Sequence, residues 1–427
     1  MTPTLTQTLF LPCAAGTETC AVDEARTLLA PLGEAARVQA ARGGCVVELA
    51  PSQGAAAVMR LNLGSRLAQR VLWRLAEAPY RDEGDLYALA RRVEWPAWIQ
   101  AGDTFKVEVT AQRSPLRSLN FAALRIKDAV CDVVREVEGE RPSVDTRRPH
   151  AVVVLHVDER QATLYVDTSG EPLFKRGWRE DKGEAPLKET LAAAMLAAAG
   201  WQGRESDGPL LDPCCGSGTI AIEAAQIACG MAPGLGRRFA FERLRPFRAH
   251  LAAWQSLRAD ARHAVHAPRV PVHASDVAFR MTDFARRNAE RAGVAHAIEF
   301  RTVDALQALP PSPSGTLLLN PPYGERIEAK GSRAPVRATP ARDVMSEGFF
   351  SRLAAHWKAH YSGWTAWVLS PDMQLPSAMR LKESRRVPLW NGPIECRLFR
   401  FEMVKGSARE RAAPPGAGAP PDATHGE

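Results

Sequence analysis

The sequence contains no long apolar run and no basic leader at its start. Across its 427 residues no stretch of 18 consecutive apolar residues occurs, so a membrane-spanning helix is not expected. The N-terminal segment MTPTLTQTLFLPCAAGTE has a few apolar residues but lacks a basic region, which makes it a poor signal peptide. These absences favour a cytoplasmic protein with no membrane partner.

Paired cysteines and spaced histidines are also missing. The eight cysteines show neither CxxC spacing nor the density of a disulfide scaffold, so we expect reduced thiols that mostly fill the core. The ten histidines are scattered without metal-ligand spacing, and no metal cofactor is expected. No arrangement of His, Asp and Ser for nucleophilic catalysis stands out.

What is present is an ordinary globular composition with a basic balance. The chain is long enough for two or three domains, with 45% hydrophobic and 24% charged residues. A net charge of +7 suits a polyanionic partner such as a nucleic acid, although many basic proteins bind nothing of the kind.

The first part of the chain, up to residue 167, reads as an α+β module without a catalytic set of residues. Apolar residues at helical or alternating spacing predict its elements. The predicted strands are 8–11, 45–49, 104–110, 151–157 and 162–167, and the predicted helices are 22–31, 55–78 and 121–133.

This module carries a run of cations at turns and helix starts. Arg and Lys supply most protein contacts to phosphate, so the run could form a phosphate-binding face. Interleaved acids, among them Asp128 and Asp145, fit a solvated surface equally well. The cations are Arg113, Arg117, Arg125, Lys127, Arg147 and Arg148.

The second part repeats strand and helix, which predicts a parallel sheet. A hairpin over 385–403, with its turn at Asn391-Gly392, adds an antiparallel edge. Residues 405–427, rich in Ala, Pro and Gly, are expected to be disordered. The predicted strands are 209–211, 270–276, 297–304, 316–320 and 363–370, and the predicted helices are 189–199, 279–292, 344–360 and one from 219.

Residues 208–223, GPLLDPCCGSGTIAIE, predict a cofactor loop. A strand ends in Asp212, and glycines let the following turn approach a ligand closely before a helix opens. Later strands end in Asp276, which could accept hydrogen bonds from a ribose, and Asp304, which could meet an adenine amino group. A dinucleotide is disfavoured because GxGxxG is absent.

Residues 317–326, LLLNPPYGER, predict a site for an exocyclic amino group. The Asn320 side-chain oxygen could accept one N–H and the Pro321 carbonyl another, while Pro322 removes a competing donor. Tyr323 offers a ring on which an unstacked base could stack. Pro-Pro alone would indicate a structural turn, but its flanks favour the functional interpretation.

These two motifs resemble those of class I S-adenosylmethionine-dependent methyltransferases. More narrowly, the segments FKRGWRE, EAPLKETLAAAML, LLDPCCGSGTIAIEAA and LLLNPPYGER resemble bacterial enzymes that methylate guanine N2 in 23S ribosomal RNA. The segments FAALRIKDAVCDVVRE and VDTRRPHAVVVLHV look like the THUMP RNA-binding domain of those enzymes.

The resemblance implies a Rossmann-like methyltransferase domain with a mixed seven-stranded sheet, preceded by a ferredoxin-like and THUMP module. The implied domains are 1–55, ferredoxin-like; 56–167, THUMP; 168–404, methyltransferase; and 405–427, a disordered tail. The single-methyltransferase form, acting as a monomer, is expected.

The resemblance also assigns roles. The basic face of the first module becomes the RNA site, and the partner is 23S ribosomal RNA or a pre-ribosomal particle. Catalytic residues are Asn320, Pro321, Pro322 and Tyr323. Residues that hold S-adenosylmethionine are Asp212, Cys214, Gly216, Ser217, Gly218, Thr219, Asp276, Asp304 and Asn320.

Two departures and several alternatives remain. Cys214 stands where the family commonly has a larger Met or Phe, and the basic loop 328–342 could be an RNA contact or a variable insert. The amino-group site would equally serve adenine N6 in DNA or RNA, or guanine N2 in transfer RNA. A non-catalytic RNA-binding assembly factor is the more distant alternative.

Overall fold

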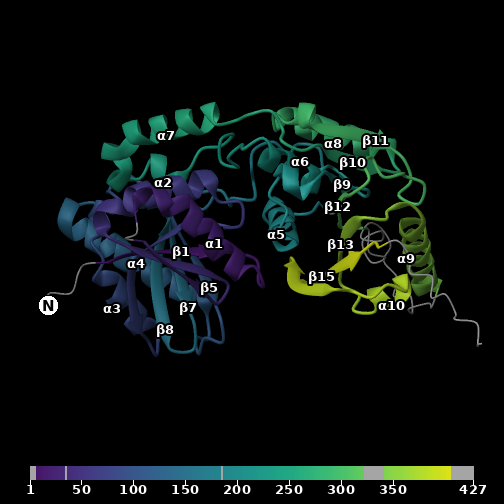
Figure 1. Cartoon of the computed structure of the whole chain (residues 1–427). Coiled ribbons are helices and arrows are strands. Elements are labelled where there is room, and N and C mark those ends of the chain that lie inside the picture. Colours follow the sequence, from purple (N-terminus) through teal and green to yellow (C-terminus); the bar gives the residue numbers. More distant parts are fainter. Residues whose placement is uncertain (1–5, 34–35, 184–185, 322–340, 405–427) are drawn as a thin grey trace, which may run out of the picture.

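The computed structural model describes residues 6–33, 36–183, 186–321 and 341–404, which form two sheets with their covering helices (Figure 1). The purple-to-blue part of the chain builds one sheet, and the teal-to-yellow part builds the other. This arrangement confirms the predicted α+β module followed by a mixed seven-stranded α/β domain. None of the described helices is long and apolar enough to cross a membrane.

The first sheet has eight strands in the order β2-β3-β1-β4-β8-β7-β5-β6. Its pairs are antiparallel except that β5 lies parallel to both β6 and β7. The strands are β1 (Gln7–Pro12), β2 (Arg37–Ala41), β3 (Gly44–Leu49), β4 (Leu72–Pro79), β5 (Thr104–Ala111), β6 (Ser143–Val144), β7 (Ala151–Val157) and β8 (Gln161–Asp167).

Four helices accompany this sheet: α1 (Glu18–Leu29), α2 (Gly54–Gly64), α3 (Glu83–Arg91) and α4 (Leu119–Glu138). The predicted helix 55–78 is wrong in its second half. Helix α2 ends at Gly64, and Leu72 and Leu75 lie in strand β4, which pairs with both β1 and β8. Strand pairing with two neighbours outweighs the helical spacing of a few apolar residues.

The second sheet has the order β11-β10-β9-β12-β13-β15-β14. Its first five strands are parallel, and β15 with β14 forms the predicted antiparallel hairpin, in which Asn391 pairs with Ile394. The elements are α5 (Glu189–Ala199), β9 (Leu210–Asp212), α6 (Thr219–Ala228), α7 (Leu251–His263), β10 (Val272–Asp276), α8 (Phe279–Arg291), β11 (Ile298–Thr302), β12 (Gly315–Leu319), α9 (Ala341–His360), β13 (Trp364–Ser370), α10 (Leu375–Met379), β14 (Arg385–Asn391) and β15 (Ile394–Glu402).

Both faces of the central strand β12 are buried, as in parallel sheets generally. Because side chains alternate along a strand, Leu317 and Leu319 of β12 pack with Trp357 of α9, whereas Leu318 belongs to the larger core that includes α5 and α6. The three leucines are fully buried. Their apolar run therefore brings Asn320 to the edge of a rigid strand.

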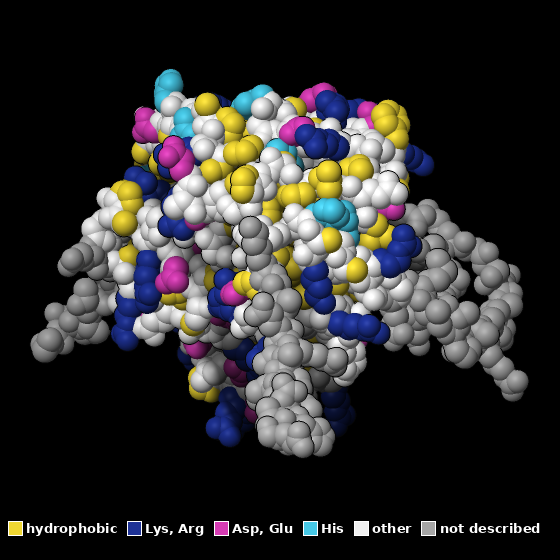
Figure 2. Space-filling view, turned by 45° about the vertical axis from the view of Figure 1, so that its right-hand side comes forward, with side chains coloured by type: hydrophobic (Ala, Val, Ile, Leu, Met, Phe, Trp, Pro, Cys, Tyr) yellow, Lys and Arg dark blue, Asp and Glu magenta, His cyan; other side chains and the backbone are white. Residues whose placement is uncertain are grey.

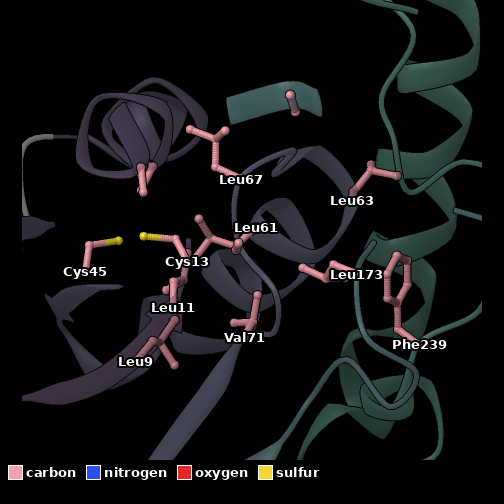
Figure 3. Packing of buried hydrophobic residues seen from close by; sticks show 14 of the residues in the cluster. Leu9, Leu11, Cys13, Cys45, Leu61, Leu63, Leu67, Val71, Leu173 and Phe239 are labelled. Atoms are coloured by element: carbon pink, nitrogen blue, oxygen red, sulfur yellow. The ribbon is translucent and has the colours of Figure 1, made fainter. Parts of the chain in front are cut away.

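The two halves share one hydrophobic core. Leu63 of α2, Leu173 of the connector that follows β8, and Phe239 beyond α6 point toward one another in Figure 3. Phe247 adds an edge-on ring contact with Trp73 of β4, with ring centroids 5.8 Å apart. The domain boundaries predicted at residues 55, 167 and 404 stay a prediction. Buried residues on both sides of residue 167 belong to the same hydrophobic core.

A buried ion-pair cluster reinforces this junction. The carboxylate of Glu223 on α6 accepts a hydrogen bond from Arg176 Nε of the connector at 3.0 Å and another from Arg66 Nη1 of the first module at 3.3 Å. Glu223 is fully buried, so both cations compensate a charge that water cannot reach. The junction therefore depends on charge pairing as well as apolar packing.

Candidate active site

The polar residues predicted at strand ends do meet at one edge of the second sheet. Strands β11, β10, β9 and β12 are neighbours and parallel, so their carboxyl ends lie side by side. Asp212 and Asp276 end β9 and β10, and Asn320 follows β12. Asp304 comes two residues after β11, so the edge carries three carboxyl groups and one amide.

The turn after β9 is tightly fitted. Cys215 N donates to the Ser275 carbonyl at 2.8 Å, which ties the turn to the end of β10. Gly218 has a φ of +89°, and a Cβ added there would lie 2.9 Å from Ala285 Cβ on α8. Gly216 has a φ of +52° but open space around it. One glycine is thus required by packing, and the other leaves room beside the turn.

Asp276 holds this turn from the neighbouring strand. Its Oδ2 accepts the Gly216 N–H at 3.0 Å and its Oδ1 accepts the Ala278 N–H at 3.0 Å. The carboxylate therefore fixes the end of β10 and the glycine turn together. Its remaining lone pairs stay available to a ligand hydroxyl.

Asp212 is nearly fully buried, and its Oδ1 accepts a hydrogen bond from Cys214 N at 3.2 Å. Burial raises the pKa of this carboxyl well above its ordinary value, and the neighbouring Asp276 charge raises it further. A buried carboxyl beside another carboxylate favours a cationic ligand, because a cation would compensate both charges.

A cavity of about 420 Å³ joins these residues and has a size suited to a small-molecule ligand. Eight of the nine predicted cofactor residues line it; the exception is Gly218, which packs against α8 instead. The sequence did not predict the apolar part of the lining. One of these apolar residues, Val277, directly follows Asp276 and is exposed. The missed lining residues are Gly183, Pro186, Leu187, Pro213, Cys215, Ile220, Val277, Met281, Ala305 and Phe349.

The predicted amino-group site is described only in part. Asn320 and Pro321 line the same cavity as the three aspartates, so the two predicted sites open into one space. Pro322 and Tyr323 lie outside the described residues, as do residues 328–340 of the predicted basic loop.

The two cysteines of the turn are poor nucleophiles. Burial raises the pKa of the Cys214 thiol and of the Cys215 thiol, and the surrounding aspartates raise both further. A thiol that is hard to ionise attacks slowly, because the thiolate is the reactive form. This agrees with the prediction that the cysteines are reduced thiols that mostly fill the core.

Arg179 supports the glycine turn from outside the cavity and was not predicted as a site residue. Its guanidinium donates to Ser217 Oγ at 2.9 Å and to Thr219 Oγ1 at 2.8 Å, and its Nε pairs with Glu189 at 2.8 Å. Asn288 of α8 donates to the Ser217 carbonyl at 3.0 Å. Both residues join sequence-distant segments, so spacing alone could not place them; only the FKRGWRE segment pointed toward Arg179.

The six predicted RNA-binding cations do not form one cluster. Arg113 and Arg117 follow the carboxyl end of β5, and Arg147 and Arg148 precede β7 near the amino end of β5. The eight residues of β5 separate these ends by roughly 25 Å at the usual rise per residue. Four of the six cations therefore lie in two groups at opposite ends of β5, and Arg125 and Lys127 lie on α4.

Several of these cations already interact with acidic or aromatic side chains. Arg113 lies 3.6 Å from Glu159, and Lys127 pairs with Asp128 at 2.8 Å. Arg125 stacks over the Tyr87 ring at 4.5 Å. On the face shown in Figure 2, Lys and Arg side chains also lie in separate groups, with acidic and hydrophobic side chains between them.

Comparison with known protein families covers both halves of the chain. Residues 80–167 match the THUMP domain, and residues 176–400 match a family described as RMKL-like, methyltransferase domain. The second match spans more than half of the chain.

Curated relatives carry the name ribosomal RNA large subunit methyltransferase K/L. The protein from Psychromonas ingrahamii is 37% identical over 372 residues, which cover 86% of this chain and 47% of the relative. The protein from Pseudomonas paraeruginosa is 36% identical over 94% of this chain and 54% of the relative. The chain therefore spans about half the length of the curated relatives it matches.

Solved structures share the whole architecture. A possible methylase from Clostridium difficile 630 has 27% identity and a TM-score of 0.80, with 94% of this chain and 99% of that chain covered. SMU.472, complexed with SAH, has 26% identity and a TM-score of 0.78 over 93% and 98%. A predicted N6-adenine-specific DNA methylase from Listeria monocytogenes has 26% identity and 0.77 over 93% and 96%.

The glycine turn with its aspartates, the amide at the end of β12 and the THUMP match agree with one another and with these comparisons. They confirm the predicted methyltransferase fold and the predicted THUMP module. The chain belongs to the family with the RMKL-like methyltransferase domain, which includes ribosomal RNA methyltransferases.

Proposed function

We propose that the chain transfers a methyl group from S-adenosylmethionine to the exocyclic N2 of a guanine in large-subunit (23S) ribosomal RNA. The observation that carries this proposal is the shared cavity, in which Asp212, Asp276 and Asp304 lie with Asn320 and Pro321. The three carboxyl groups favour binding of a cationic nucleoside. The Asn320 side-chain oxygen and the Pro321 carbonyl can accept hydrogen bonds from an amino group.

The residues present fit S-adenosylmethionine. Its ammonium and sulfonium charges complement the buried Asp212, which accepts from a neutral backbone N–H and forms no ion pair with a described cation. Asp276 would accept from the ribose hydroxyls and Asp304 from the adenine amino group, while open space at Gly216 admits the ligand. SAH bound to the similar SMU.472 supports the same choice of cofactor.

When bound, the cofactor supplies a methyl group on an already activated sulfonium. The protein therefore contributes position and orientation rather than a strong base. Asn320 would accept one amino hydrogen through its side-chain oxygen, and the Pro321 carbonyl would accept the other. These bonds would aim the nitrogen lone pair, and the apolar walls of the cavity would exclude water.

Ribosomal RNA is the proposed substrate because two independent features favour it. The matched THUMP domain is expected to bind RNA, and the curated relatives are named for large-subunit ribosomal RNA. A partner of this kind also suits the net charge of +7.

A second candidate is methylation of adenine N6. The similar Listeria structure is described as an N6-adenine-specific DNA methylase, and an amide with a neighbouring carbonyl can receive any exocyclic amine. Guanine N2 in transfer RNA is a further variant of the same chemistry. The THUMP match favours RNA over DNA.

The test compares modified nucleosides in ribosomal RNA from cells with and without the protein. We expect one N2-methylguanosine of the large-subunit RNA to disappear and to return when the gene is restored. Purified protein with labelled S-adenosylmethionine is then offered ribosomal RNA, transfer RNA and DNA. Transfer to adenine or to DNA would contradict the proposal, and absence of cofactor binding would favour a non-catalytic assembly factor.

A further inference from the structure

A second cavity, of about 670 Å³, lies where the connector after β8 meets the segment after α6. We call it the connector cavity. Its lining contains seven lysines and arginines but only two glutamates. Its lining is therefore strongly basic.

The acids near the connector cavity are already paired. Glu189 binds Arg179 at 2.8 Å, and Glu171 pairs with Lys175. Among the described residues, Lys182, Lys188 and Arg238 have no ion pair to a carboxylate, and all three are exposed. The cavity therefore keeps an excess of positive charge that solvent or a ligand must balance.

One wall of the connector cavity holds a buried cation. The Arg237 side chain is largely buried, and its guanidinium donates to the carbonyls of Pro172 at 2.7 Å and Lys175 at 3.0 Å. Burial lowers the pKa of Arg237 to about 10, which leaves it charged at neutral pH. Its contacts are neutral carbonyls, so its charge adds to the field in the cavity.

The connector cavity adjoins the cofactor cavity. Pro186 and Leu187 line both. Arg179, which lines the connector cavity, donates to Ser217 and Thr219, which line the cofactor cavity. An RNA strand whose target base enters the cofactor cavity would therefore pass close to these cations.

We infer that the connector cavity binds backbone phosphates of the RNA strand next to the methylated nucleotide, an inference that rests on the proposed function. Lys188 and Arg238 would contact the phosphates directly. Lys188 is held in place because its ammonium lies 5.2 Å from the centre of the Phe174 ring. This gives the chain an RNA contact in the connector, outside the THUMP domain.

The test uses the full chain and a double charge reversal, Lys188→Glu with Arg238→Glu. The matched control is Arg262→Glu with Arg269→Glu, which makes the same charge change at exposed positions outside both cavities. Binding of protein-free large-subunit ribosomal RNA is measured over a range of salt concentrations. The affinity for S-adenosylmethionine without RNA checks that each variant is folded.

We expect the cavity variant to bind the RNA at least about tenfold more weakly and to reduce the salt slope of log K by about 2, one for each phosphate that the variant no longer binds. The control should change little. Equal RNA binding by the two variants would overturn the inference. It would also be overturned if sodium tripolyphosphate bound the parent protein at this cavity without competing with RNA.

This inference and the proposed function can be tested separately, because RNA binding and methyl transfer are measured in different assays. A parent protein that binds RNA through Lys188 and Arg238 but methylates no nucleic acid would contradict the proposed function and leave the phosphate contact itself standing. A parent protein that methylates guanine N2 while both double variants bind RNA alike would contradict only the present inference.

Discussion

The two sheets of this molecule use their strand ends differently. In the first sheet most neighbouring strands are antiparallel, so successive strand ends alternate between two edges, and four of the six predicted RNA-binding cations divide between the ends of β5. In the second sheet five neighbouring strands are parallel, so one edge collects Asp212, Asp276, Asp304 and Asn320. Parallel strands bring the polar residues at their carboxyl ends to one edge of the sheet, whereas antiparallel strands place successive ends at opposite edges.

This difference suggests a division of work. Changes at the edge of the second sheet should alter cofactor binding or methyl transfer without altering RNA affinity. Changes among the cations of the first module should alter RNA affinity and its salt dependence, and leave the cofactor untouched. Because the two regions share a core, we expect them to unfold together.

The largest effect is expected for Asn320→Ala. Losing the hydrogen-bond acceptor for the amino group should lower the rate constant for methyl transfer by roughly 100- to 1000-fold. Cofactor and RNA affinities should stay within about threefold of the parent values, well below the roughly tenfold that 1.4 kcal/mol represents. Single-turnover transfer and separate binding titrations check this, and equal loss of transfer and cofactor binding would contradict the division of roles.

A second prediction concerns the junction of the two halves. Glu223→Gln removes the carboxylate that compensates Arg66 and Arg176, both largely buried, so the free energy of unfolding should fall by about 3 kcal/mol. Chemical denaturation should still give one transition because the core is continuous. Glu402→Gln, which removes an exposed partner of Arg400, is the control and should cost under about 1 kcal/mol. Two separate transitions would show that the halves fold independently.

Asp212→Asn should raise the dissociation constant of S-adenosylmethionine roughly ten- to hundredfold, because the substitution removes a charge-assisted hydrogen bond to the cofactor. The same variant should be more stable than the parent without ligand. Burial raises the pKa of Asp212 above its unfolded value, so parent stability falls as pH rises through the folded-state pKa.

Thermal unfolding of the ligand-free proteins at pH 5 and pH 8 measures this dependence. The fall in unfolding temperature between the two pH values should be smaller in the Asn variant than in the parent. An unchanged cofactor affinity together with an unchanged pH dependence would remove Asp212 from the cofactor site.

The smallest effect is expected for Arg147→Ala with Arg148→Ala in the first module. Both side chains are exposed without an ion pair to a described carboxylate, so they can reach phosphate freely. RNA affinity should fall a few-fold, with a salt slope lower by about 2. Arg113→Ala, which releases Glu159, should change affinity less, and the opposite ranking would argue against these positions as the RNA contact.

The sequence predicts the second sheet well because each of its parallel strands carries apolar residues and ends at, or just before, a polar residue. Strands β9 to β13 and the hairpin appear within about three residues of their predicted bounds. The residues of the glycine turn and Asn320 could be chosen because their chemistry is local to two motifs. Their gathering in one cavity follows from the parallel order of the strands.

The first module is predicted less well because tertiary contacts determine where several of its strands and helices begin and end. Strand β4 follows α2 without a clear change of pattern, and the short strand β2 has a single neighbour, β3. Helix α3 had a usable signal, since Asp82 caps it by accepting the N–H groups of Gly84 and Asp85. Arg179 and the connector cavity depend on contacts between distant segments, which spacing does not encode.

The central claim is that the edge of the second sheet methylates guanine N2 in large-subunit ribosomal RNA. Its most direct test is mass analysis of nucleosides after labelled transfer from S-adenosylmethionine to that RNA, with the parent protein and with Asn320→Ala. We predict label in N2-methylguanosine with the parent and almost none with the variant. Label in N6-methyladenosine, or equal label with both proteins, would contradict the account.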